Sequence, residues 1–266
     1  MPESITDQML SFGLGFVRDA GRMQLDAFGS ASRELKGPLD VVTEADHAIE
    51  DAFKRRLAED FPSHGFVGEE TTAGDDGDPA ADPAGGWAWV LDPIDGTRGY
   101  VSGTPTWGVL IALRDAERVL YGMIDQPFTG ERFEGGAGPA EWSRGAERRP
   151  LGVRATEALA DATILTTFPE VGSPAERAAF ERVAGRCRLT RHGLDCYGYA
   201  LLALGQVDLV VEAGLQPYDI AAPIGVVEAA GGIVTAWDGG PAIDGGTAVA
   251  AATPALHRAA LELLGG

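Results

Sequence analysis

The stretch Trp89-Val-Leu-Asp-Pro-Ile-Asp-Gly-Thr-Arg-Gly-Tyr100 places two carboxylates, a glycine and a hydroxyl directly behind an apolar segment. The apolar residues 87–91 predict a buried strand, and Pro93 then predicts a turn. A turn at this point would bring the carboxylates of Asp92 and Asp95 together at the end of the strand. Carboxylate oxygens are the ligands that hard divalent cations prefer, so the stretch predicts a metal site.

Two other interpretations of this stretch deserve comparison. A calcium loop of the EF-hand type needs an oxygen ligand at its third position and an acid at its twelfth, but these positions hold Ile94 and Gly103. That interpretation fails. An ordinary turn, in which the aspartates only cap a helix, remains open for the stretch taken alone.

The composition limits what the protein can bind. The 266 residues carry 40 acidic and 21 basic side chains, which gives a net charge of −19. Such a surface argues against nucleic acid and against anionic membranes as partners. The two cysteines, Cys187 and Cys196, form no metal-binding motif, and no segment has the pattern of a signal peptide or of a membrane span. We therefore expect a soluble protein in a reducing cytoplasm.

The first half of the chain is predicted to combine helices with an antiparallel sheet. Helices are expected over residues 6–28 and 40–60, a short strand over 65–68, and a surface loop over 71–86. Further strands are expected over 107–113, 119–125 and 132–134. Residues 146–152 are expected to join this half, residues 1–150, to a second half, residues 151–266.

The second half alternates strands with helices in the α/β manner. Strands are expected near residues 162–167, 186–191, 207–212, 232–235 and 247–251. Helices are expected near residues 174–184, 196–205 and 218–230, with a last helix from Pro254.

Three motifs in order then give a resemblance that covers nearly the whole chain. They are Gly68-Glu69-Glu70, the stretch from Trp89 to Thr97, and Tyr218-Asp-Ile-Ala-Ala222 followed by Glu228-Ala-Ala-Gly-Gly232. Together they resemble the signatures of the inositol monophosphatase superfamily. The resemblance implies a layered α+β and α/β fold, an alternating α-β-α-β-α sandwich. It also implies a homodimeric phosphomonoesterase that uses two or three Mg²⁺ ions per active site.

The same resemblance implies a set of metal ligands. Glu69, Asp92 and the carbonyl of Ile94 would hold one Mg²⁺, and Asp92, Asp95 and Asp219 would hold a second. Carboxylates suit Mg²⁺, which takes few protein ligands and keeps several waters. Two such ions would activate a water and neutralise the leaving oxygen.

The resemblance also assigns catalytic and phosphate-binding roles. Thr97 and Asp46 match the pair that orients the attacking water, with Glu69 counted beside them as catalytic. The amides of Gly96 and Thr97 match a phosphate cradle, and Lys36 matches a lysine near the phosphate. Taken singly, Asp46 could only cap a helix, and Lys36 could only be a solvated surface residue.

Finer features resemble the histidinol-phosphate phosphatase branch of that superfamily. They include Arg98 after Asp-Gly-Thr and the segment Arg191-His-Gly-Leu-Asp-Cys-Tyr197. Because histidinol phosphate carries an ammonium and an imidazole, a pocket lined by acids is expected, with Asp195 and Glu212 as candidates. Arg98 and Arg191 are candidate substrate residues as well. Asp195 could instead cap the next helix, and both arginines could form surface ion pairs.

These observations lead to one main hypothesis and two others. The main hypothesis is a Mg²⁺-dependent phosphatase of L-histidinol phosphate. The first alternative is a phosphatase of inositol 1-phosphate or a related small molecule. The second, of a different class, is a metal-binding module without activity; the intact carboxylate set argues against it.

Overall fold

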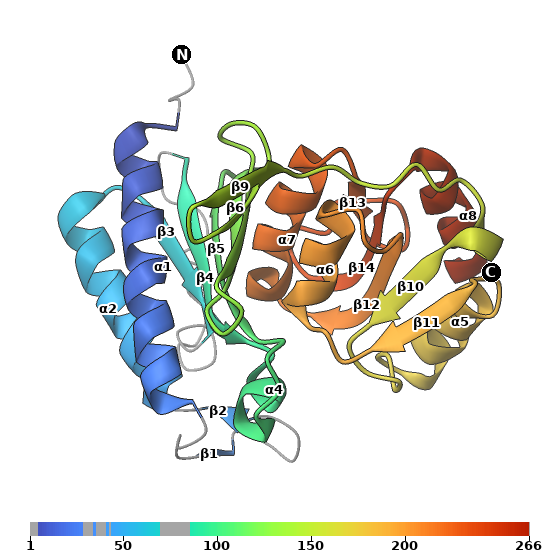
Figure 1. The fold of residues 1–266 in the computed structure, drawn as a ribbon, viewed down its shortest axis with the longest axis horizontal. Coiled ribbons are helices and arrows are strands. Elements are labelled where there is room, and N and C mark those ends of the chain that lie inside the picture. Colours follow the sequence, from blue (N-terminus) through green and yellow to red (C-terminus); the bar gives the residue numbers. More distant parts are fainter. Residues whose placement is uncertain (1–4, 29–33, 36–40, 43, 70–85, 266) are drawn as a thin grey trace.

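The computed structural model describes residues 5–28, 34–35, 41–42, 44–69 and 86–265, and five layers follow one another across it (Figure 1). Two helices cover the outer face of a seven-stranded sheet, two more lie between this sheet and a five-stranded one, and a third pair covers the far side. The predicted α-β-α-β-α sandwich is therefore confirmed.

The outer helices of the first layer are α1 (Asp7–Ala27) and α2 (Glu44–Asp60). Thr6 caps α1, because its hydroxyl accepts a hydrogen bond from the Met9 amide at 3.3 Å. One face of α1 is buried against α2 and the sheet, and the ring centroids of Phe12 and Phe53 lie 5.3 Å apart. The helix α2 begins later than expected, because Val41–Val42 (β2) pairs instead with Glu34–Leu35 (β1) in a small hairpin.

The seven-stranded sheet has the order β3-β4-β5-β6-β7-β8-β9, with only β3 and β4 parallel. The strand near residue 65 and the three antiparallel strands are confirmed. Within the segment expected to join the two halves, residues 147–150 pair with β8 as the edge strand β9, and the division into halves stays a prediction. The strands are β3 (Gly65–Gly68), β4 (Ala88–Asp95), β5 (Gly108–Arg114), β6 (Val119–Gln126), β7 (Glu131–Gly135), β8 (Glu141–Arg144) and β9 (Glu147–Pro150).

The five-stranded sheet has the order β11-β10-β12-β14-β13. Parallel pairing joins β10 to β11 and to β12, while β14 runs antiparallel to both of its neighbours. The strands are β10 (Thr163–Thr166), β11 (Leu189–His192), β12 (Leu209–Leu215), β13 (Ile233–Thr235) and β14 (Gly246–Ala251). The helices are α5 (Pro174–Ala184), α6 (Cys196–Ala203), α7 (Pro217–Ala229) and α8 (Pro254–Leu264), with a short 3₁₀ turn, η1 (Leu159–Asp161).

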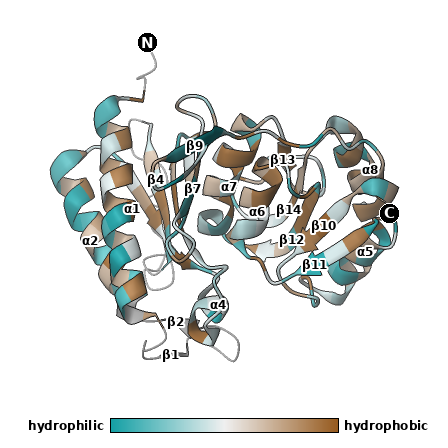
Figure 2. Cartoon of the chain, viewed as in Figure 1, coloured by the Kyte–Doolittle hydropathy of each residue, from teal (hydrophilic) through white to brown (hydrophobic). Residues whose placement is uncertain are grey.

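The largest core cluster lies between the two sheets, around α6 and α7. Figure 2 shows both helices as mostly hydrophobic, as expected for helices that are buried on all sides. The helix α7 packs closely on β6: a Cβ atom at Gly122 would lie 2.4 Å from the carbonyl oxygen of Ala222. This close approach fixes the position of α7 against the sheet. It thereby also positions Asp219, the acidic residue in the first turn of α7.

Among the described residues, no helix combines the length and the apolarity that crossing a bilayer requires.

Candidate active site

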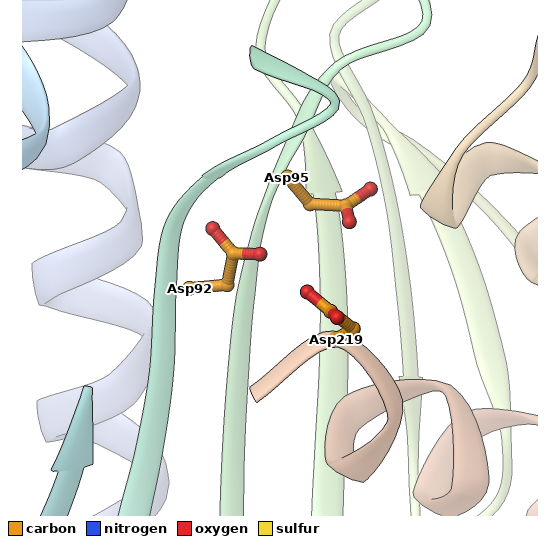
Figure 3. Close-up of side chains that lie close together, drawn as sticks. All are labelled: Asp92, Asp95 and Asp219. Atoms are coloured by element: carbon orange, nitrogen blue, oxygen red, sulfur yellow. The ribbon is translucent and has the colours of Figure 1, made fainter. Parts of the chain in front are cut away.

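A β-bulge in strand β4 brings the first two candidate ligands together. Asp92 pairs with Leu110 and Asp95 pairs with Gly108, so that two residues of β4 lie opposite one residue of β5. In a regular strand, residues three apart point to opposite faces of the sheet. The extra residue of a bulge shifts the alternation by one position, and both carboxylates therefore point the same way (Figure 3). The expected turn at Pro93 is wrong in this respect, because the strand continues through it.

The third carboxylate comes from the other half of the chain. Asp219 lies in the first turn of α7, where its Oδ2 accepts a hydrogen bond from the Gln216 amide at 2.7 Å. Figure 3 shows its side chain reaching toward Asp92 and Asp95. One oxygen of each of these three residues lies within 4.8 Å of the others. The structure thus brings together residues 124 positions apart in sequence, from Asp95 to Asp219.

Burial and like charge make this group unfavourable without a cation. Burial is the main cause of the raised pKa of Asp92, and the charges of Glu69, Asp95, Asp219 and Asp46 raise it further. Burial also raises the pKa of Asp95, and it raises that of Asp219 to about 6. Neighbouring carboxylates that disfavour one another's ionisation are the arrangement that a bound cation would stabilise.

The donor set fits a small divalent cation. The buried Oδ1 of Asp92 has no hydrogen-bond partner among the described residues, although a buried carboxylate oxygen normally has one. Oxygen ligands converging from two elements are what Mg²⁺ takes in proteins. The Asp92, Asp95 and Asp219 group, hereafter the acid group, could therefore hold such an ion.

Three predicted residues stand outside this acid group. Glu69 follows directly on β3, and its charge acts on Asp92, but its oxygens are not among those that converge within 4.8 Å. Asp46 is buried in α2, and its charge also acts on Asp92. Lys36 lies outside the described residues. The roles expected for all three stay predictions.

The residues that follow the bulge form a tight connection into α4 (Thr97–Ser102). Gly96 has a φ of +79°, in the left-handed region that favours glycine. The Thr97 hydroxyl donates a hydrogen bond to the Ile94 carbonyl at 2.8 Å. That carbonyl has a second lone pair, so the bond leaves room for the metal contact expected of Ile94.

Asp195 faces the site and does not cap its helix. It precedes α6, yet its side chain makes no capping hydrogen bond. A Cβ atom on Gly96 would lie 3.0 Å from the Asp195 Cγ, so the carboxylate packs directly over the connection into α4. Its φ of 47° is the one positive value outside glycine in the described chain. Backbone strain of this kind costs about 1–3 kcal/mol and is common at functional sites.

Glu212 extends the acidic region away from the acid group. It is buried in β12 and accepts hydrogen bonds from the Thr166 hydroxyl at 2.9 Å and from the Thr167 amide at 2.7 Å. Burial raises the pKa of Glu212 to about 7, and the charge of Asp195 contributes to the rise. Burial likewise raises the pKa of Asp195 to about 6, although the charge of Arg98 opposes it.

The two arginines occupy different environments. The Arg98 guanidinium carbon lies 4.2 Å from the ring centroid of Phe168, and its charge acts on Asp195. Arg98 therefore lies at the edge of the acidic region. Arg191 is exposed on the edge strand β11, where it pairs with Leu165. A contact between Arg191 and a substrate stays a prediction.

The sequence pattern missed several residues that hold these acids in place. The Cys196 amide donates a hydrogen bond to Asp95 Oδ2 at 2.6 Å, across a sequence separation of 101 residues. Thr166 and Thr167 hold Glu212, as described above. Two consecutive hydroxyl side chains at the end of a predicted strand could have identified Thr166 and Thr167 as partners of a polar group. No local signal could have found a backbone amide that binds a distant carboxylate.

A first prediction concerns the glycine beneath Asp195. We expect Gly96→Ala to lower the free energy of unfolding by about 1–2 kcal/mol, because alanine disfavours the left-handed conformation. The added methyl group also pushes the Asp195 carboxylate, so KM for the substrate should rise. Chemical denaturation and steady-state kinetics measure the two effects.

Gly103→Ala is the matched control for this variant. Gly103 has a φ of +78°, and an added Cβ there meets nothing within 4 Å. It should show the loss of stability without the change in KM. An equal change in KM in both variants would contradict the steric role of Gly96.

Comparisons with known proteins identify relatives along the whole chain. Residues 6–265 match the family described as the Inositol monophosphatase family. A chloroplastic bifunctional phosphatase of Arabidopsis thaliana is 39% identical over 204 residues, which cover 77% of this chain and 57% of that protein. A histidinol-phosphatase of Streptomyces coelicolor is 34% identical, with 100% and 98% coverage. The solved structure of an inositol monophosphatase from Zymomonas mobilis superposes with a TM-score of 0.84 at 32% identity, covering 99% of this chain and 100% of the other.

Proposed function

The chain belongs to the inositol monophosphatase family, and from that premise we propose that it is a Mg²⁺-dependent histidinol-phosphatase. It would hydrolyse L-histidinol phosphate to L-histidinol and phosphate, a step of histidine biosynthesis, in the cytoplasm and as a homodimer. The phosphatase reaction follows from the family. The substrate, the biosynthetic pathway, the cytoplasmic location and the homodimer are the parts that we propose.

The observation that carries the reaction is the acid group. Enzymes of this family use Mg²⁺, and three carboxylate oxygens within 4.8 Å supply the ligands that it prefers. Asp92, Asp95 and Asp219 would hold one ion, and Glu69, Asp92 and the Ile94 carbonyl another. When bound, Mg²⁺ lowers the pKa of a water and stabilises charge on the leaving oxygen.

The remaining roles belong to the chain's own groups. The Thr97 hydroxyl would orient the attacking water, and the Asp46 carboxylate would accept its proton. The amides of Gly96 and Thr97, with Lys36, would hold the phosphate. The water oxygen would form a bond to phosphorus while the ester bond breaks, and the leaving oxygen would take a proton from solvent water to become the alcohol.

The observation that supports histidinol phosphate is the continuous acidic region beyond the acid group. The charge of Asp195 acts on Asp95 and Asp219 on one side and on Glu212 on the other. A substrate whose phosphate binds at the acid group would therefore extend its ammonium and imidazole toward Asp195 and Glu212. Opposite charges in such a partly desolvated site attract strongly.

Inositol 1-phosphate is the second candidate substrate. The likeness to the inositol monophosphatase of Zymomonas mobilis, at 32% identity, favours it. Asp195 and Glu212 could also accept hydrogen bonds from sugar hydroxyls, but neutral donors form weaker bonds with carboxylates than cations do. A metal-binding module without activity would not need this second acidic region.

Steady-state kinetics on three substrates test the proposal. With saturating Mg²⁺, we expect kcat/KM for histidinol phosphate to exceed that for inositol 1-phosphate by about 10- to 100-fold, the value of one charged hydrogen bond. Adenosine bisphosphate should be a poor substrate. A higher kcat/KM for inositol 1-phosphate would reject the substrate and keep the reaction. No phosphatase activity on any of them would reject the reaction as well.

A further inference from the structure

A glutamine in the first helix reaches the bulge that carries the acid group. Gln24 lies in α1, and its side chain is fully buried. Its Nε2 donates a hydrogen bond to the Pro93 carbonyl, across a sequence separation of 69 residues. Its own backbone carbonyl accepts a hydrogen bond from the Tyr100 hydroxyl at 2.7 Å. Gln24 therefore connects α1 to both ends of the segment that contains Asp95.

The position of this hydrogen bond matters because of the bulge. Pro93 and Ile94 are the two residues that oppose a single residue of β5, between the paired Asp92 and Asp95. A bulge disrupts the regular ladder, so its carbonyls need other partners. The Thr97 hydroxyl donates a hydrogen bond to the Ile94 carbonyl at 2.8 Å, and the Gln24 side chain donates one to the Pro93 carbonyl. Each carbonyl of the bulge is thus held by a side chain.

We infer that Gln24 is a positioning residue of the metal centre. It holds the bulge in the conformation that turns Asp92 and Asp95 to the same face of the sheet. Without it, the Pro93 carbonyl loses its partner and the bulge can shift, which changes the orientation of the two carboxylates. The inference rests on the proposed function, since it requires that the acid group binds a cation.

The chemistry of Gln24 agrees with a positioning role more than with a role in stability. Its Oε1 is buried without a hydrogen-bond partner among the residues that the structure describes. A buried unpaired oxygen costs about 1–3 kcal/mol, so an apolar residue of similar volume would avoid that cost. What the glutamine contributes and an apolar residue cannot is the donor to Pro93.

Gln24→Met tests this inference, because methionine keeps the volume and the helix propensity but has no donor. The readout is the Mg²⁺-induced rise in Tm, followed over a titration from zero to high Mg²⁺. We expect the half-saturating Mg²⁺ concentration to increase by about 10- to 100-fold, as for other groups that orient metal ligands. Without Mg²⁺, Tm should stay close to that of the wild type. Gln24→Leu, which also lacks a donor and adds no charge near the acid group, replaces the methionine variant if that protein does not fold.

Tyr100→Phe is the matched control, because it removes the neighbouring hydrogen bond to Gln24 and leaves the Pro93 carbonyl paired. It should lower Tm at every Mg²⁺ concentration and leave the half-saturating concentration near the wild-type value. Equal Mg²⁺ responses of Gln24→Met and the wild type would overturn the inference, as would a tenfold or larger change in Tyr100→Phe. If the wild type itself showed no Mg²⁺ response, the proposed metal-dependent function would fail first.

Discussion

Asp95→Asn is expected to reduce kcat by roughly three orders of magnitude, equivalent to about 4 kcal/mol of transition-state stabilisation, while the protein remains folded. Asp95 is one of the three carboxylates that converge within 4.8 Å. Asparagine keeps the shape and can still accept the hydrogen bond from the Cys196 amide, but it has no negative charge. Near-wild-type turnover at saturating Mg²⁺ would refute the proposed metal site.

The same variant should be at least as stable as the wild type when Mg²⁺ is absent. Burial and the charges of Asp195 and Asp219 raise the pKa of Asp95 above its value in the unfolded chain. A raised carboxyl pKa means that the folded state loses stability as the pH rises through the two pKa values. At pH 8, asparagine avoids that loss. Thermal unfolding of the variant and the wild type in EDTA at pH 8 measures this difference in stability.

Asp208→Asn is the matched control for a buried aspartate outside the site. Asp208 is fully buried, accepts a hydrogen bond from the Thr163 amide at 2.8 Å and pairs with Arg154 at 3.3 Å. The change should lower Tm by weakening this ion pair but leave kcat close to the wild-type value. The opposite effects of the two variants would separate the metal site from the structural role of buried acids.

Glu212→Gln is expected to lower kcat/KM for histidinol phosphate by about 10- to 100-fold at pH 8, and that for inositol 1-phosphate by about fivefold. The difference arises because a cationic group loses a charged partner, whereas a hydroxyl loses only a better acceptor. The amide oxygen of glutamine can still accept the hydrogen bonds from Thr167, and its NH2 group can donate one to the Thr166 hydroxyl. Equal losses for both substrates would contradict the role of Glu212 in selecting a cation.

The effect of this variant should depend on pH. The pKa of Glu212 is raised to about 7 by burial, so the wild-type carboxylate is charged above that pH and increasingly neutral below it. The ratio of wild-type to variant kcat/KM for histidinol phosphate should therefore be largest at pH 8 and decrease toward pH 6.

Glu131→Gln provides the comparison for a buried glutamate outside the acidic region. Glu131 accepts hydrogen bonds from Trp142 Nε1 at 3.0 Å and from the Tyr197 hydroxyl at 2.7 Å. Its removal should change Tm and leave the ratio of kcat/KM between the two substrates unchanged. A change in that ratio would show that selectivity responds to any loss of buried charge.

Much of the fold could be predicted because its signals are local. The 3.6-residue pattern of α1 and the apolar run of β4 were sufficient to identify both elements. The hairpin of β1 and β2 was missed because strands of two residues give no periodic signal. The strand β9 was also missed: all four of its residues are exposed, so no alternation of apolar side chains marks it.

The sequence by itself determined which carboxylates converge, since Asp92, Asp95 and Asp219 stand in motifs that can be read in order along the chain. Only the tertiary structure decided how they meet. The stretch that predicted a turn is a bulge, and the pairing register of β4 against β5 turns both carboxylates to one face. The Cys196 amide holds the Asp95 carboxylate and the Gln24 side chain holds the Pro93 carbonyl, and these partners come from 101 and 69 residues away. Such contacts depend on how helices pack on a sheet, and no pattern within one segment encodes them.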